Sequence, residues 1–257
     1  LKGRRKAESE RTSKNIESFV FSMPLGLAAI AYITFFIGIA GFLHKSLLML
    51  LLLLLAILLF REIKAIIKIF FAYIKNFNLT GIIKKYDIGF NFYTIAIIFL
   101  LLLVLLNFIA SFVPPWHFDV IAYHLAIQKI YIKAHQIVYI PYIFYSNLPS
   151  LVDAIYLMGL LLHSGILSNL LGCSLGAVLV LAIFLFSKRF FNLKIALLAP
   201  LIFYSMPNVI RSSRTSHVDL QFALFVFLSY YAMFIYINSN NRKHMALSAI
   251  FAGFGLS

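Results

Sequence analysis

Residues 47–60 read Leu47-Leu-Met-Leu-Leu-Leu-Leu-Leu-Leu-Ala-Ile-Leu-Leu-Phe60, an apolar run without a single charge. The core of a soluble domain does not need so uniform a run of leucine. Of the 257 residues, 63% are hydrophobic and 12% are charged, which is about half the charged share of ordinary soluble domains. Other apolar runs approach or exceed the ~20 residues that span a hydrocarbon core. The sequence therefore predicts an all-α fold, a polytopic transmembrane helical bundle.

The basic residues around this run predict how the chain is oriented. The net charge is +14, but the Lys and Arg residues form short clusters between apolar runs, as in cytoplasmic loops. This distribution argues against nucleic-acid binding. Residues 1–18 and 61–85 carry two such clusters. The positive-inside rule places both in the cytoplasm, so we expect a multi-pass protein of the cytoplasmic (inner) membrane with a cytoplasmic N-terminus.

The clusters divide the chain into four parts. Residues 1–18 are expected to be a cytoplasmic basic tail, and residues 19–60 a transmembrane hairpin that turns near Gly41–Lys45. Residues 61–87 are expected to be a cytoplasmic amphipathic basic segment, either an interfacial helix or an extension of the preceding helix. Residues 88–257 are expected to be the N-terminal part of a transmembrane domain that is truncated at its C-terminus. Three lysines of the basic segment fall on one helical face: Lys64, Lys68 and Lys75.

A large outer loop is predicted over residues 113–165. The span that leads to it covers Ile88–Val113 and ends at Pro114 and Pro115, because paired prolines stop a helix. Residues 151–163 form an apolar stretch of only 13 residues, which is short for a span. We therefore expect short interfacial or re-entrant helices in this loop.

The remaining apolar runs predict how the chain continues. Residues 166–187 are long enough to cross the membrane and lead to a basic cluster, which places that end inside. Residues 195–207 and 219–237 predict a second hairpin, with its outer turn at Pro207–Val218. About six crossings result on this count, and a seventh begins at Met245.

Three acids fall on the outer side of this topology: Asp119, Asp153 and Asp219. An acid at a membrane boundary is costly unless it is solvated or paired, so each is a functional candidate. The alternatives are a solvated loop acid for Asp119 and helix-start acids for Asp153 and Asp219. If a short helix begins near Trp116, Asp119 and Tyr123 share one face of it at i, i+4.

The outer histidines make a divalent metal site conceivable. All histidines except His244 fall outside, and His117 and His124 share a second face of the short helix. No tight histidine spacing supports a metal site, and solvated or core histidines remain the alternative. The candidate ligands are Asp119, Asp153, His217 and Asp219.

Basic residues on the outer side run against the positive-inside bias. Arg211 and Arg214 lie in the second outer turn, and Lys129 and Lys133 lie in the first loop. A phosphate-bearing ligand at the outer interface would explain them. Anchoring to the headgroups of membrane lipids is the alternative.

The run from Trp116 to Asp219 resembles the GT-C superfamily of polytopic glycosyltransferases. The likeness is closest to glycosyltransferase family 39, which includes protein mannosyltransferase-like, aminoarabinose- and galacturonosyltransferase-type enzymes. Asp119 is followed by Val120, so the paired-acid form of some members is absent. The motifs that carry the resemblance are Asp119 in Phe-Asp-Val-Ile-Ala-Tyr-His-Leu, Tyr145–Pro149 followed by Asp153, Asp219 in Ser-His-Val-Asp-Leu, and Phe251–Ser257 as the start of a Gly-rich helix.

This resemblance implies transfer of a hexosyl or pentosyl group from a polyprenyl-phosphate donor to a glycan, lipid or protein acceptor on the outer face. Asp119 would act as the general base. Arg211 and Arg214 would stabilise the departing phosphate, with or without a divalent metal. The alternatives are a transporter or flippase of a lipid-linked or anionic substrate, and an inactive truncated remnant. The substrate-binding residues that we expect are Tyr123, His124, Asn147, Arg211, Arg214 and Asp219.

Overall fold

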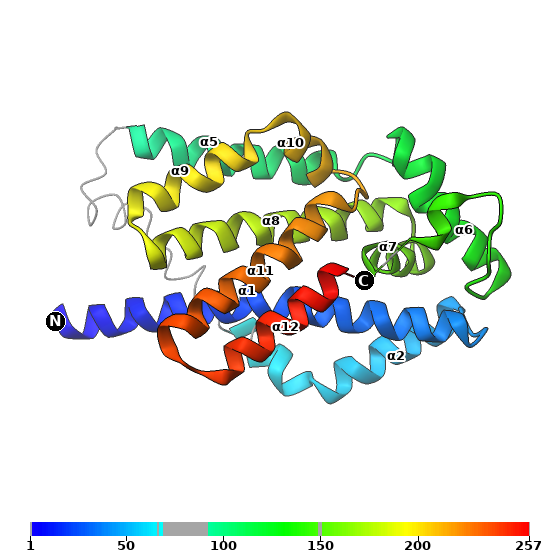
Figure 1. Cartoon of the computed structure of the whole chain (residues 1–257), viewed down its shortest axis with the longest axis horizontal. Helices are drawn as coiled ribbons and strands as arrows, with labels where there is room; N and C mark the ends of the chain where they lie inside the picture. The colour runs from blue at the N-terminus through cyan, green and yellow to red at the C-terminus, as the bar shows by residue number, and fades with distance from the viewer. Residues whose placement is uncertain (1, 66, 69–91, 149–150, 257) are drawn as a thin grey trace.

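The computed structural model describes residues 2–65, 67–68, 92–148 and 151–256. These residues form helices and no strand (Figure 1), which confirms the predicted all-α class. In chain order the helices are α1 (Lys2–Ile39), α2 (Lys45–Leu58), α5 (Phe92–Ala110), η1 (Val120–His124), α6 (Leu125–Ala134), η2 (Phe144–Asn147), α7 (Leu151–Leu162), α8 (Gly165–Phe190), α9 (Leu193–Tyr204), α10 (Pro207–Ser213), α11 (Asp219–Ser239) and α12 (Arg242–Leu256).

Three described helices are long and apolar enough to cross a membrane: α1 over Lys14–Ile39, α8 and α11. The pair α9 and α10 makes a fourth if it is one span, bent by 77°. The sequence predicted about six crossings, so the two counts differ. The reason lies in helix length, because α2 has only 14 residues and α9 only 12. The predicted span 88–113 corresponds to α5, which is described only from Phe92.

The N-terminal part of the chain is a helical pair. Residues 40–44 turn the chain between α1 and α2, and Gly41 adopts a φ of 81° there, a conformation that glycine allows without strain. The residues that were expected to be a tail belong to α1, which begins at Lys2. Of the predicted basic segment 61–87, residues 66 and 69–87 lie outside the described part of the chain.

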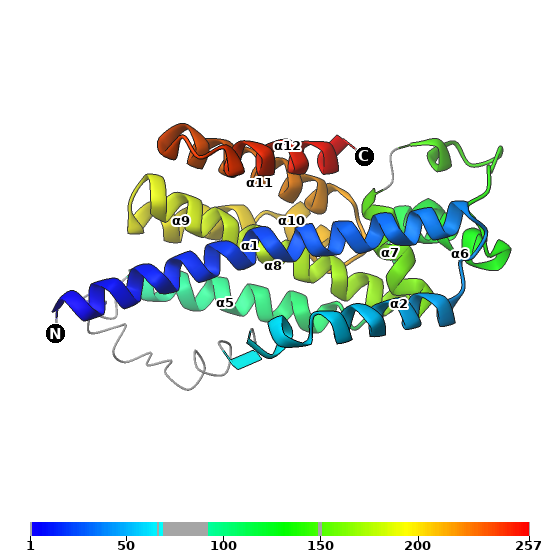
Figure 2. The ribbon, with the colours of Figure 1, turned by 90° about the horizontal axis from the view of Figure 1, so that it is seen from below.

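Helix α1 runs the length of the bundle, from the N-terminus to α6 and α7 (Figure 2). It packs against α7 and α8, while α11 packs against α8 and α12. At its far end, the Gly38 carbonyl accepts a hydrogen bond from the Ile137 amide at 3.0 Å. The rings of His44 and His135 stack beside this contact, with centroids 4.2 Å apart. The turn of the N-terminal pair therefore supports the segment that follows α6.

The other end of α1 is joined to α8 and α11 through Glu17. The Arg189 guanidinium donates to both carboxylate oxygens of Glu17, at 2.6 and 2.8 Å, and the Tyr231 hydroxyl donates to one of them at 2.6 Å. Tyr231 is buried. One acid thus connects three helices at the end of the bundle opposite α6 and α7.

Candidate functional site

The chain enters the site through an unusual helical turn. After Pro114–His117, which is not helical, η1 forms one π-helical turn and continues directly into α6. The π-helix hydrogen bond spans five residues rather than four, and such turns are frequent at functional sites. The short helix expected near Trp116 is therefore present from Phe118. Its π turn changes the α-helical register that the sequence argument assumed for Asp119 and Tyr123.

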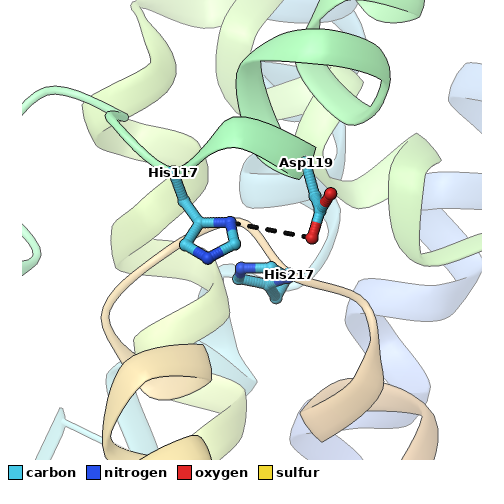
Figure 3. A group of neighbouring side chains, drawn as sticks. All are labelled: His117, Asp119 and His217. Atoms are coloured by element: carbon cyan, nitrogen blue, oxygen red, sulfur yellow. Dashed lines mark ion pairs between the residues drawn. The ribbon is translucent and has the colours of Figure 1, made fainter.

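A cluster of three potential ligands forms where this turn meets the segment between α10 and α11 (Figure 3). His117, Asp119 and His217 each offer one donor atom, and these atoms lie within 4.8 Å of one another. The Nδ1 atom of His117 is 3.8 Å from Oδ2 of Asp119. The rings of His117 and His217 meet edge to face, with centroids 4.3 Å apart. We call these three residues the HDH cluster.

The environment of the HDH cluster keeps His217 neutral. Its side chain is buried, with 6% of the residue exposed. The pKa of His217 is lowered to about 4, mainly by burial, because a charged imidazole loses its hydration there. The neighbouring His117 and His124 also lower this pKa. His217 therefore presents an unprotonated nitrogen at neutral pH, which is the form that binds metal ions.

A second pair links the π turn to α7. His124 Nδ1 lies 2.9 Å from Asp153 Oδ1, and 9% and 15% of these side chains are exposed. Asp153 stands in the first turn of α7, as the helix-start alternative expected, but it also has this specific partner. From the same helix, the Tyr156 hydroxyl donates a hydrogen bond to the His217 carbonyl. Helix α7 thus contacts both η1 and the segment between α10 and α11.

A cavity of about 340 Å³ lies beside these contacts. Its polar walls come from Tyr123, His124, Tyr145, Asp153 and Asp219, and its apolar walls come mainly from α7, α11 and α12. The rings of Tyr123 and Tyr145 stack with centroids 4.1 Å apart. Asp219 is exposed at the start of α11.

Burial and the charges of the three outer acids all raise the pKa of Tyr123. Burial raises the pKa of Tyr123, and the charges of Asp119, Asp219 and Asp153 raise it as well, together with Tyr145. A carboxylate disfavours a nearby phenolate through charge repulsion. Tyr123 therefore stays neutral, and acids of three separate segments contribute to the electrostatic field at its phenol.

Helix α8 holds the two segments of the site in position. The amide nitrogen of Asn169 donates to the Val113 carbonyl at 3.0 Å, and its amide oxygen accepts from the Ser216 hydroxyl at 2.8 Å. Asn169 and Ser216 are buried. Because Val113 precedes His117 and Ser216 precedes His217 in the chain, one side chain positions both histidines of the HDH cluster.

Three predicted substrate-binding residues are not members of the HDH cluster. Arg211 is exposed on α10 and donates to Asn208 at 3.3 Å. Asn147 is exposed and donates to the Phe144 carbonyl of its own turn at 3.3 Å. Arg214 lies in the turn after α10, and its Nε atom is buried without a hydrogen-bond partner in the described part of the chain.

The sequence argument did not select His117 as a ligand, although a signal was present. His117 stands two residues before Asp119, and His217 stands two residues before Asp219. This repeated His-x-Asp pattern marks the two segments that the structure brings together. It does not show which carboxylate joins the histidines, and the HDH cluster contains Asp119 but not Asp219.

Comparison with protein families gives a match in the C-terminal part of the chain. A family model described as dolichyl-phosphate-mannose-protein mannosyltransferase matches residues 149–257. The match includes Asp153, His217 and Asp219, and it begins after Asp119. No curated protein and no solved structure matches the chain. The match and the apolar helices support a multi-pass membrane glycosyltransferase of the GT-C type.

Proposed function

We propose that this protein transfers a sugar from a polyprenyl-phosphate donor to an acceptor on the outer face of the inner membrane. One observation carries the proposal. Two carboxylates from separate helices, Asp153 and Asp219, line one cavity together with Tyr123, and the turn that carries Tyr123 also carries Asp119. The same chain matches the mannosyltransferase family model over residues 149–257. The aminoarabinose- or galacturonosyl-type specificity belongs to this proposal as a narrower form of it.

The walls of the cavity suit a donor with a polar head and an apolar tail. Asp153 and Asp219 lie on its polar side, whereas Phe222 of α11 and Phe254 and Leu256 of α12 supply apolar surface. A sugar bound near the carboxylates can use their oxygens as hydrogen-bond acceptors. The polyprenyl chain would then extend along the apolar helices, where burial from water favours it.

We assign the general base to Asp119, whose side chain is 41% exposed and therefore within reach of an acceptor. Asp119 takes the proton of the acceptor hydroxyl, and the oxygen forms a bond to the anomeric carbon. The bond from that carbon to the phosphate oxygen breaks, and the phosphate leaves with the electron pair. This single displacement inverts the anomeric centre. Arg214 and Arg211 are the candidates to stabilise the leaving phosphate.

The distribution of acids favours a transferase over a transporter. A transporter of an anionic or lipid-linked substrate typically has its binding site near the middle of the membrane. Among the described spans, α8 contains no acid, and α11 has its acid at the first residue. The acid of the first span, Glu17, lies near one end and is paired with Arg189.

The proposal is tested by replacing Asp119 with Asn in the full-length protein. Membranes that contain each variant are incubated with a panel of polyprenyl-phosphate sugars, and labelled product is measured. Loss of a general base lowers the rate by about 10²–10⁴-fold, so we expect transfer to fall by at least about a hundredfold while membrane insertion stays normal. Glu62→Gln, an exposed acid on another segment, is the matched control. Wild-type rates in Asp119→Asn would refute the assignment of the base.

A further inference from the structure

The HDH cluster has the donor set of a transition-metal site. Two imidazole nitrogens and one carboxylate oxygen meet within 4.8 Å, and three such ligands with an open fourth position are typical of catalytic zinc sites. Bonds of about 2.0–2.1 Å would bring tetrahedral donors to roughly 3.4 Å from one another. Closing that gap needs side-chain movement of about an ångström or less. His117 stands in a non-helical segment that permits it.

Two nitrogen atoms of the HDH cluster lack partners. The Nδ1 atom of His117 and the Nε2 atom of His217 are buried and have no hydrogen-bond partner in the described part of the chain. The 3.8 Å separation of His117 Nδ1 from Asp119 is too long for a hydrogen bond. Buried polar atoms without a partner are uncommon, and an ion at the site is one of their explanations.

We infer that His117, Asp119 and His217 bind one divalent metal ion of the zinc class. Imidazole ligands favour zinc and similar transition metals, whereas magnesium and calcium prefer oxygen ligands. The second carboxylate oxygen of Asp119 points away from both rings (Figure 3). Asp119 therefore binds the ion through one oxygen and keeps the other available to a hydroxyl. The inference goes beyond sugar transfer, because metal binding can be measured without any transfer reaction.

The neighbouring acids occupy other positions. Asp153 is already hydrogen-bonded to His124 at 2.9 Å. Asp219 lines the cavity at the start of α11. Of the four ligands that the sequence suggested, Asp119 and His217 are therefore the two that we place on the metal, and His117 completes the set.

The test measures metal binding by the full-length protein purified in detergent. Zinc content is determined by elemental analysis, and Co²⁺ is titrated into the metal-free protein and followed by its visible absorption. We expect about one zinc per chain in the wild type. Loss of a supporting residue around a metal site already costs about 10–100-fold in affinity, so His117→Gln and His217→Gln should each weaken Co²⁺ binding by more than about a hundredfold. His163→Gln, an exposed histidine that pairs with Ser164, is the matched control.

The possible results separate this inference from the proposed transfer. Wild-type protein without bound zinc and without a Co²⁺ spectrum would overturn the inference, as would unchanged affinity in both variants or an equal loss in His163→Gln. Size-exclusion chromatography verifies that each variant is folded, and Asp119→Ala provides a third ligand variant if one histidine variant aggregates. Metal binding without any transfer product would contradict the proposed function alone.

Discussion

The side chains of His124 and Asp153 meet at 2.9 Å and join the π turn η1 to the first turn of α7. Both side chains are largely buried. A hydrogen bond between buried polar groups is strengthened by the low local dielectric and restricts the orientation of both partners. This pair therefore determines how the segment that carries Asp119 and Tyr123 lies against α7.

Replacing either partner of this pair should reduce transfer, and the two losses should not add. His124→Ala and Asp153→Ala each remove the same hydrogen bond, so the double variant should lose little more than the worse single variant. Residues in contact typically show coupling of about 0.5–3 kcal/mol. The measurement is kcat/KM for all four proteins of the cycle. Full additivity of the two losses would show that the pair does not act as a unit.

Asn169→Ala should weaken the site without removing any of its ligands. This change removes the hydrogen bonds to Val113 and Ser216. It leaves the buried Ser216 hydroxyl without that acceptor, at a cost of about 1–3 kcal/mol. Both zinc affinity and transfer should fall. Ser174→Ala on the same helix, where the hydroxyl donates to the Leu171 carbonyl of its own turn, is the control and should behave as the wild type. Normal zinc affinity in Asn169→Ala would argue against the positioning role.

Gly159→Ala should destabilise the contact between α7 and α8. A Cβ atom at Gly159 would lie 2.9 Å from the backbone nitrogen of Ser168, and a backbone atom cannot move aside cheaply. Overpacking of this kind costs about 1–3 kcal/mol, so the Tm in detergent should fall. Gly26→Ala in α1 is the control, because no atom lies within 4 Å of its added Cβ. An equal Tm in the two variants would contradict the tight crossing.

Glu17→Ala should loosen α1 from the rest of the bundle. The exposed Arg189 pair contributes at most about 1 kcal/mol, but the buried Tyr231 hydroxyl loses its acceptor, which costs about 1–3 kcal/mol. The Tm should fall, and protease should cut the N-terminal helix sooner. Glu17→Gln keeps an acceptor oxygen for Tyr231 and should recover most of the stability. Glu62→Ala serves as the control for loss of an exposed acid.

Cysteine labelling should place the two ends of the bundle on opposite sides of the membrane. Cys173 is the chain's one cysteine and is buried, so it gives a low background. Tyr142, which is 75% exposed, and Asn240, which is exposed after α11, are replaced by Cys one at a time. An impermeant maleimide should label Tyr142→Cys in intact cells and Asn240→Cys only after permeabilisation. The reverse pattern would overturn the predicted orientation.

Part of the candidate site could be predicted from local sequence. Asp153 and Asp219 stand in the first turns of α7 and α11. An acid directly before an apolar run predicts such a helix-start position. The pairing of Asp153 with His124 could not be predicted, because it depends on how α7 packs against η1 rather than on spacing. The π turn was also missed, because its sequence, Val-Ile-Ala-Tyr-His, is compatible with an ordinary α-helix.

The sequence by itself determined the helical membrane class, because uncharged runs such as residues 47–60 leave no soluble alternative, and hydropathy is a local property. It also located the turn of the N-terminal pair near Gly41. Only the tertiary structure decided that His117 lies against His217, a hundred residues later in the chain, and that Tyr231 reaches Glu17. Contacts of this kind depend on the helix-to-helix packing set by residues such as Gly159 and on buried links such as Asn169. No spacing along one helix encodes them.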